Sequence, residues 1–442
     1  MTSGSLAQTD SLTVRFDKID NHLNNGMGYT NVLGNTSGYA WGESYVLSAY
    51  IDMYRATGDT LYLDKLVEQF DRVLANRDDA RHINDYYRKA PIAGWGSTEY
   101  SKGKWHTWLV HTGMICQGPA DFVQIVRAEG RLKKYAAKAD LYLQKIKESV
   151  SSHEPDWRNG PGKDEGYYVD PEIGPLPVNQ QNAMGSVLVS LYHTTRDHFY
   201  RDKASQLARF MQKRLRKRPD GSFDWSYWPR LDGNGRGSED ISHAAININF
   251  AVRCRAQKIV FSNQDMDAFA LTWTHYIRRS AHEFADNVDG KGGTNTHSPQ
   301  AVGRWMDLSM FNHAILEDGL TVFGDLADEK ASGADLLGIA KLAHYRKVFD
   351  QPKRPLIPRI KLLKKRHASL ANSVREVDVN VLMTKASRST ASKIATLTND
   401  SNEPFPSPDL TELFPYILLP EPPPYFAPEP ITYPGPTHYK LT

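Results

Sequence analysis

The chain has 442 residues, of which 40% are hydrophobic and 24% are charged. This composition supplies enough apolar side chains for a sizeable core and excludes a wholly disordered or collagen-like chain. Lys and Arg total 54 against 51 Asp and Glu, and the resulting net charge of +3 does not suggest a nucleic-acid-binding protein. With only two cysteines, the chain has neither a disulfide framework nor a four-cysteine zinc site.

The N-terminal segment, residues 1–10, is polar and lacks the apolar centre of a signal peptide. No stretch reaches ~18 consecutive apolar residues, so we expect no transmembrane helix. These features predict either a cytoplasmic protein or an exported one whose leader is absent from this chain.

A short internal repeat is the clearest pattern in the first 350 residues. Residues 54–65 match residues 192–203, with Tyr, Thr, Asp, Tyr, Asp and Lys at the same positions in both. Each copy joins a helical pattern that is apolar nearly all round to one that has a single apolar stripe. The repeat therefore predicts hairpins of a buried helix followed by an amphipathic one.

Five or more such hairpins are expected, at intervals of roughly 60–70 residues, which indicates a helical repeat architecture. They pair residues 45–54 with 62–74, 105–128 with 134–150, 177–194 with 200–215, 238–256 with 264–282, and 302–319 with 329–344. The alternation predicts an all-α protein, an (α/α) toroid with first helices inside and second helices outside. An open α-solenoid is the alternative, although its repeats are usually ~34–47 residues long.

The composition changes near residue 350, because fifteen of the 25 prolines follow it. We expect residues 1–350 to form the toroid, as a catalytic domain. Residues 351–442 are predicted to be a largely disordered tail, basic at 351–367 and then Pro-rich, since dense proline favours extended, solvated chain. A segment that docks a partner or an anionic surface is the alternative interpretation of this tail.

The inner helices of a toroid all begin at one end, and their first turns are unusually polar here. A buried polar group without a partner costs a few kcal/mol. Polar first turns in several inner helices therefore predict a water-filled, functional cavity at that end of the toroid. The candidate residues are Trp41, Glu43, His106, His111, Asn179, Gln180, Glu239, His243, Asn247, Arg304 and Trp305, with Tyr227 and Trp228 from an aromatic loop.

Some of these residues have a purely structural alternative. Glu239 and Asp240 suit a helix N-terminus, Asn179 suits a helix cap as well as a site role, and a hydrogen-bonded core histidine is the alternative for His243, which its pairing with Asn247 on one helix face makes the less favoured one. His106 and His111 lie five residues apart, which does not place them on one helix face, and no H-E-x-x-H motif occurs. We therefore predict no metal site and no cofactor.

Two segments resemble a known group of enzymes. They are Trp41-Gly-Glu-Ser-Tyr followed by residues 54–64, and Trp225-Ser-Tyr-Trp-Pro followed by Glu239-Asp-Ile-Ser-His-Ala. Over about residues 35–320 the chain resembles bacterial (α/α)-toroid lyases that act on alginate and glucuronan, and more distantly the C-terminal domains of glucuronyl C5-epimerases. The resemblance implies β-elimination on a uronic-acid-containing polysaccharide.

Such a lyase neutralises the substrate carboxylate, removes the adjacent proton and protonates the leaving oxygen. For the roles that the resemblance implies, the candidates are Asn179, Gln180 and Arg304 to hold the carboxylate, with His243 as base and Tyr227 as acid; the sequence leaves open which of these two is the base and which is the acid. The other candidate residues would bind substrate.

Three alternatives remain open at this point. A toroid glycoside hydrolase would use Glu239 or Asp240 as general acid and Glu43 as base. A uronate C5-epimerase would use the same proton abstraction, and a non-catalytic carbohydrate-binding protein would use the tail to recruit a partner. An acidic polysaccharide is the expected ligand, and no nucleic acid is expected.

Overall fold

The computed structural model describes residues 3–30, 37–229, 231, 237–293 and 298–350. The predicted tail, residues 351–442, lies outside the described residues. Within them, no helix is both long enough and apolar enough to cross a membrane.

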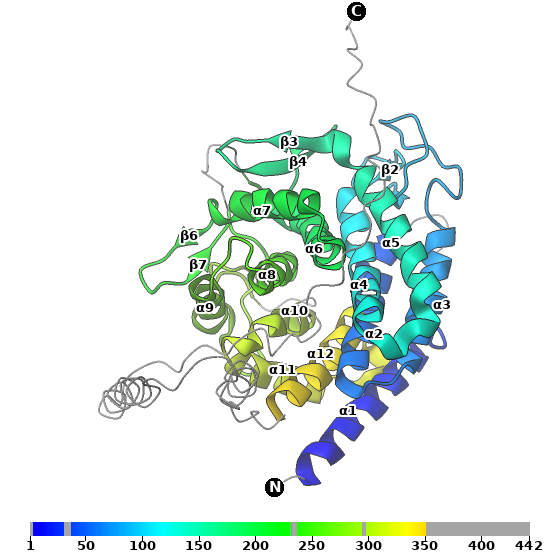
Figure 1. The fold of residues 1–442 in the computed structure, drawn as a ribbon. Helices are drawn as coiled ribbons and strands as arrows, with labels where there is room; N and C mark the ends of the chain where they lie inside the picture. Colours follow the sequence, from blue (N-terminus) through cyan, green and yellow to red (C-terminus); the bar gives the residue numbers. More distant parts are fainter. Residues whose placement is uncertain (1–2, 31–36, 230, 232–236, 294–297, 351–442) are drawn as a thin grey trace, which may run out of the picture.

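The helices form two concentric layers, as Figure 1 shows. The inner layer consists of α2 (Ser44–Thr57), α4 (Leu109–Ala128), α6 (Val178–Thr195), α8 (Ile241–Ala256), α10 (Ser298–Trp305) and α12 (Gly333–Asp350). Each inner helix packs on the next, and α12 packs on α2, which closes the ring. The outer layer consists of α1 (Ser3–His22), α3 (Leu61–Ala75), α5 (Ala136–Ser151), α7 (His198–Gln212), α9 (Asn263–Thr272) and α11 (Ala314–Asp325). The fold is an (α/α) toroid, as predicted.

The apolar patterns account for the two layers. Helix α4 is buried on almost every side from Leu109 to Val126, because it has ring neighbours on both flanks and α5 behind it. Helix α3 buries one stripe only, which contains Tyr62, Leu66, Phe70 and Val73. A single stripe fits a helix that packs on the ring and faces solvent on its other side.

The internal repeat encodes the turn between an inner and an outer helix. Helix α2 is capped at its C-terminus by Gly58 with φ of 77°, and helix α6 by Arg196 with φ of 59°. The aspartate that follows each of them accepts a hydrogen bond, Asp59 from the Leu61 N–H and Asp197 from the Phe199 N–H, at 2.9 Å in both cases. The aspartate therefore recurs because it satisfies an unpaired N–H at the start of the outer helix.

The last predicted hairpin is wrong in its pairing. Residues 302–319 do not form one helix, because α10 ends at Trp305 and is followed by a 3₁₀ segment (Met306–Met310) and the outer helix α11. The predicted outer helix 329–344 is instead the inner helix α12, which lies between α10 and α2 and is covered by α1. In α12 the side chain of Lys341 is buried against Asp307, as fits an inner helix.

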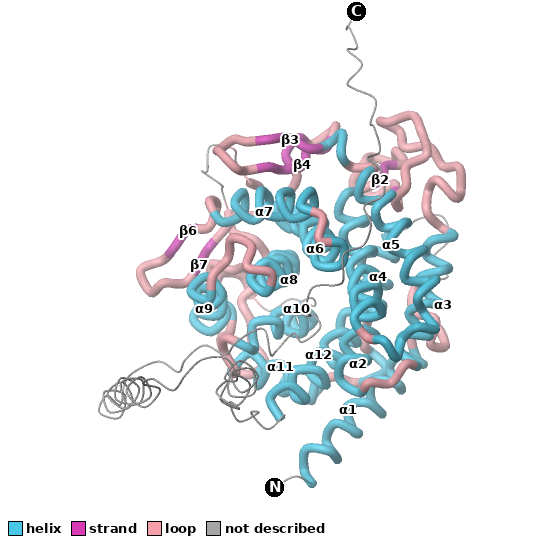
Figure 2. Tube along the Cα trace, viewed as in Figure 1, coloured by secondary structure: helices cyan, strands magenta, loops and turns pink. Residues whose placement is uncertain are grey.

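Short strands lie in the long loops that precede the inner helices (Figure 2). Strands β1 (Gly96–Ser97) and β2 (His106–Thr107) precede α4, and β3 (Trp157–Asn159), β4 (Gly166–Asp170) and β5 (Gly174–Pro175) precede α6. Strands β6 (Arg216–Lys217) and β7 (Phe223–Asp224) precede α8. All three groups are antiparallel. They therefore belong to the end of the ring at which the inner helices begin.

Candidate functional site

Aromatic and polar side chains from separate inner helices meet at this end of the ring. The Trp41 ring, in the π-helical turn before α2, lies edge-on to His111 of α4 at 6.1 Å and to His243 of α8 at 6.5 Å. The Tyr227 ring lies 5.2 Å from that of His243. The Tyr227 carbonyl accepts a hydrogen bond from the backbone N–H of Val178, the residue before Asn179 in the first turn of α6. We call these five residues the mouth cluster: Trp41, His111, Asn179, Tyr227 and His243.

His243 is held by the residue that caps its helix. Asp240 is the N-cap of α8 and accepts the backbone N–H groups of Ser242 and His243, both at 3.1 Å. The other oxygen of the same carboxylate contacts His243 Nδ1. Burial opposes ionisation of Asp240, but the hydrogen bonds from His243 and Ser242 outweigh it and lower the pKa of the carboxyl. The side chains of His243 and Asp240 remain 38% and 37% exposed, so an ionised acid and an imidazole both reach the surface.

Tyr227 lies beside this pair in its protonated form. It follows β7 in the aromatic loop, and burial raises the pKa of its hydroxyl to about 12. The neighbouring Trp228 is 46% exposed and packs edge-on against it at 5.3 Å. A protonated phenol next to an ionised carboxylate–histidine pair supplies a proton donor and a proton acceptor.

Several buried polar atoms at this end have no partner among the described residues. Asn179 is fully buried, and neither its amide oxygen nor its amide nitrogen has a hydrogen bond. The same holds for Gln180 Oε1, for Nε2 of the fully buried His111, and for Arg304 Nε. Each unpaired buried group costs about 1–3 kcal/mol, so their concentration at one end of the ring is consistent with a polar ligand or bound water there.

His111 is a neutral member of the cluster. Burial lowers the pKa of its imidazole to about 4. Nδ1 lies 3.2 Å from the Trp95 carbonyl, to which it donates in the neutral ring, so Nε2 is left as an acceptor. His111 can therefore accept a hydrogen bond from a ligand hydroxyl at neutral pH.

Arg304 lines a cavity that is enclosed by residues of the inner helices. It donates to the Ser242 carbonyl at 2.8 Å and to the Tyr45 hydroxyl at 3.1 Å. The Ser242 carbonyl belongs to the residue that precedes His243 in the first turn of α8. Arg304 therefore connects this cavity to the start of the helix that carries His243.

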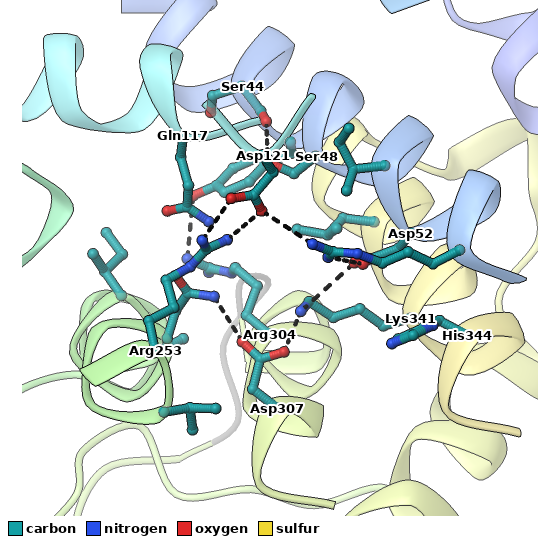
Figure 3. A pocket seen from close by; sticks show the side chains of 18 of the residues that line it. Ser44, Ser48, Asp52, Gln117, Asp121, Arg253, Arg304, Asp307, Lys341 and His344 are labelled. Carbon is teal, nitrogen blue, oxygen red and sulfur yellow. Dashed lines mark hydrogen bonds and ion pairs between the residues drawn. The ribbon is translucent and has the colours of Figure 1, made fainter. Parts of the chain in front are cut away.

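The axial cavity contains a layer of charged side chains (Figure 3). Arg253 makes two hydrogen bonds of 2.7 Å with Asp121, and Lys341 contacts Asp307. Further charged lining residues are Asp52 and Arg55, which pair at 3.1 Å. With Arg304, the cavity lining has three acids and four bases, and the ion pairs between Arg55 and Asp121, Arg253 and Asp121, and Lys341 and Asp307 join different inner helices or their ends, so the layer has the character of a structural tie.

Glu43 and Glu239 do not form a pair of catalytic carboxylates here. Glu43 is fully buried and accepts the Tyr29 N–H at 2.7 Å, and burial raises its pKa to about 8. Glu239 is fully buried against Trp225 and Asn247, and burial raises its pKa well above the usual range. Burial therefore favours the protonated form of both carboxyls, which makes Glu43 poorly suited to the role of base.

The structure gives three other predicted binding residues internal partners. His106 is buried between Asp85 and Asp170, with one ring nitrogen 2.7 Å from each carboxylate. Trp305 is fully buried and donates to the Ile241 carbonyl at 2.9 Å. Asn247 accepts from Asn182 at 2.7 Å and donates to Glu239 at 2.6 Å.

The axial layer was not predicted from the sequence, although it leaves a signal there. Asp121 and Arg253 interrupt helices that are otherwise apolar nearly all round. A charged residue in such a helix faces either another charge or a cavity. Among the described residues, no group of three or more His, Cys, Asp or Glu side chains is placed to hold a metal ion.

No protein-family model and no curated protein matches the sequence. Among solved structures, the fold is similar to that of the GH76 alpha-mannanase of Bacteroides thetaiotaomicron, with a TM-score of 0.50 and 15% sequence identity. The similarity covers 77% of this chain and 96% of the mannanase chain. At this level of identity the comparison supports the toroid fold and does not carry over catalytic residues.

Proposed function

We propose that this chain is an enzyme that cleaves glycosidic bonds of a polysaccharide at the mouth cluster. The observation that carries the proposal is the fully buried Asn179, whose unpaired amide stands at the end of the ring where Tyr227, His243 and Asp240 meet. An amide with a free donor and a free acceptor matches the hydroxyl groups of a sugar. The toroid fold, shared with a glycoside hydrolase, supports a carbohydrate substrate.

Cleavage needs one group to accept a proton and one to donate a proton. Asp240 is ionised, and its contact with Nδ1 orients His243, so the pair is suited to act as base. Tyr227 is protonated and is suited to donate to the leaving oxygen. Trp228, 46% exposed beside it, offers a face for a sugar ring.

Hydrolysis is the reaction that the fold comparison favours, because the GH76 protein is an alpha-mannanase. In this chain the base that activates water would be Asp240 with His243, rather than Glu43 as first considered. Glu239 is protonated but fully enclosed, so Tyr227 is the better placed donor.

Elimination is the second candidate, and the contact between Tyr227 and His243 favours it. The same base would remove the proton next to a uronate carboxylate instead of activating water. Asn179, Gln180 and Arg304, each with an unpaired side-chain atom, would then hold that carboxylate.

Product analysis separates the two reactions. The protein is incubated with alginate, glucuronan, their carboxyl-reduced forms and α-mannan, while reducing ends and absorbance near 235 nm are followed. Hydrolysis releases reducing ends without absorbance, whereas elimination releases both and requires the carboxylate. Release of neither product from a broad glycan panel, by a preparation with an intact thermal transition, would contradict the proposed function.

A further inference from the structure

The axial cavity is lined by one more base than acid. Its volume is about 90 Å³, which leaves room for water molecules or a small ion. The lining acids are Asp52, Asp121 and Asp307, and each of them contacts a lining base, which is Arg55, Arg253 and Lys341 in that order. The fourth base is Arg304, and within the described part of the chain no carboxylate pairs with it.

The acids of the lining are already paired with their own bases. Burial opposes the ionisation of Asp121 and Asp307, but the charges of Arg253 and Lys341 outweigh it and lower both pKa values. His344 in the same lining is neutral at pH 7, because burial lowers the pKa of its imidazole to about 4. Four bases against three acids therefore leave the lining with one positive charge.

The groups that hold Arg304 are neutral. Its Nη1 donates to the Ser242 carbonyl at 2.8 Å and to the Tyr45 hydroxyl at 3.1 Å, and its guanidinium lies 5.1 Å from the centre of the Tyr45 ring. Its Nε atom is buried and has no partner among the described residues. Neutral groups orient a cation without cancelling its charge, and a buried charge without a counter-charge is unfavourable.

Uncharged hydrogen-bond donors complete the surroundings of Arg304. The Tyr45 hydroxyl oxygen accepts from Arg304, and its own proton has no acceptor in the described ranges. Figure 3 shows the Gln117 side chain, which comes from α4, pointing into the cavity, where its amide makes no hydrogen bond to the residues that the structure describes. Free donors around an unpaired guanidinium are the coordination that an anion requires.

We propose that the axial cavity binds a small monovalent anion such as chloride against Arg304, with the Tyr45 hydroxyl and the Gln117 amide as further donors. One negative charge makes the lining neutral, whereas a dianion such as sulfate would reverse its charge. The inference goes beyond the proposed function, because this anion is a resident part of the ring and is bound whether or not a glycan is present. It links α10 to α2 and α4 and thereby stabilises the closed ring.

Thermal melting of the full chain, without any glycan, tests this site. Chloride replaces gluconate stepwise at constant ionic strength and pH. We expect the melting temperature of the wild type to rise by about 2–4 °C and then to level off, as for binding at one site. Arg304→Gln, which makes the lining neutral, should lose this rise. The control Arg127→Gln removes the charge of an exposed arginine outside the cavity and should keep it.

Two further measurements do not depend on the folding of Arg304→Gln. Gln117→Met keeps the volume of the side chain and removes its donor, so the chloride concentration at half of the rise should increase about 10-fold. Crystals of the wild type grown in bromide should show an anomalous peak in the axial cavity beside Arg304.

An equal rise in the wild type and in Arg304→Gln would show that chloride acts elsewhere on the protein and would overturn the inference. Crystals in which the cavity holds no bromide would also overturn it. A rise of the same size with sulfate, lost in Arg304→Gln, would overturn the assignment to a monovalent anion. Failure to cleave any glycan, with the chloride response intact, would contradict the proposed function and leave the anion site unaffected.

Discussion

The Asp240 carboxylate holds His243 through both its backbone and its ring. One oxygen accepts the His243 N–H at 3.1 Å, and the other contacts Nδ1 of the imidazole. The same side chain thereby begins helix α8 and fixes the orientation of a candidate catalytic residue. The capping role and the site role, which the sequence presents as alternatives, are compatible in the folded chain.

Replacing Asp240 with Asn should separate these two roles. Asparagine caps a helix about as well as aspartate, so the capping contribution to the free energy of unfolding should change by less than about 0.5 kcal/mol. The base would lose its charge, and kcat should fall by about 10²- to 10⁴-fold. Asp240→Ala should lose both the activity and about 1 kcal/mol of stability. Thermal melting and kcat, measured on the same preparations, test this, and an active Asp240→Asn enzyme would remove the carboxylate from the mechanism.

Tyr227→Phe and His243→Ala test the proposed donor and base. Tyr227→Phe removes only a hydroxyl group, so the melting temperature should hardly change while kcat falls by about 10²- to 10⁴-fold. His243→Ala should lower kcat to a similar extent. If His243 served only to pack the helix, stability would fall by about 1–3 kcal/mol and kcat of the folded fraction would stay near the wild-type value. Full activity of Tyr227→Phe would make Tyr100, exposed nearby, the next candidate donor.

Much of the ring was predictable because the features that define it can be seen in short segments of the sequence. The inner and outer helices differ in how much of their circumference is apolar, and the turn between them repeats the aspartates Asp59 and Asp197 in the sequence. The last hairpin was not predictable in the same way. Helix α12 carries Lys341, and only the tertiary contact to Asp307 on a different helix makes that position an internal one.

For the candidate site, the sequence predicted the end of the toroid at which the residues lie, but not which of their side chains are in contact. That Trp41, His111 and His243 meet follows from the common end of the inner helices, which the hairpin pattern establishes. The enclosure of Glu239 and the clamping of His106 depend on loops whose paths no periodicity encodes. Asp85 and Asp170 lie 85 residues apart in the sequence, in two different loops. Nothing in the local sequence marks them as partners of the same imidazole, that of His106.

His106 should make stability depend on pH on the alkaline side of neutrality. Its pKa rises from 6.5 to about 9 on folding, so its contribution is complete below pH 6.5 and disappears as the pH rises through about 9. The difference corresponds to about 3 kcal/mol. The lowered pKa of Asp85, about 2, contributes stability that is complete above pH 3.8 and is lost only as the pH falls toward about 2, so it does not change between pH 6 and pH 10. Urea unfolding of wild type and His106→Gln at pH 6 and pH 10 should give a large difference at pH 6 and a small one at pH 10; equal differences would show that the ion pairs do not set this dependence.

Truncation after Asp350 should leave a folded toroid. Helix α12 ends there, and the ring is already closed by its contacts with α2 and covered by α1. We therefore expect the circular dichroism of residues 1–350 to keep its helical signal, with a melting temperature within a few degrees of that of the full chain. A large loss of either would mean that residues 351–442 pack on the ring. Removal of residues 1–22 is the contrasting variant, since it uncovers α12 and should destabilise the domain strongly.

The buried pair of Asp121 and Arg253 should be the most sensitive point of the axial layer. Burial raises the pKa of Asp121, but the charge and the hydrogen bonds of Arg253 outweigh this effect and hold the pKa at about 2, so the pair is ionised at all ordinary pH values. Arg253→Met leaves a buried carboxylate with only Arg55, at 3.6 Å, as a cation nearby. Breaking a buried pair in this way typically costs about 3–5 kcal/mol, whereas removing Glu68 from its exposed pair with Arg72 should cost less than about 0.5 kcal/mol. Urea unfolding measures both variants, and a cost for Arg253→Met as small as that for Glu68→Gln would mean that water already solvates the layer through the axial cavity and that the charges do not tie the inner helices together.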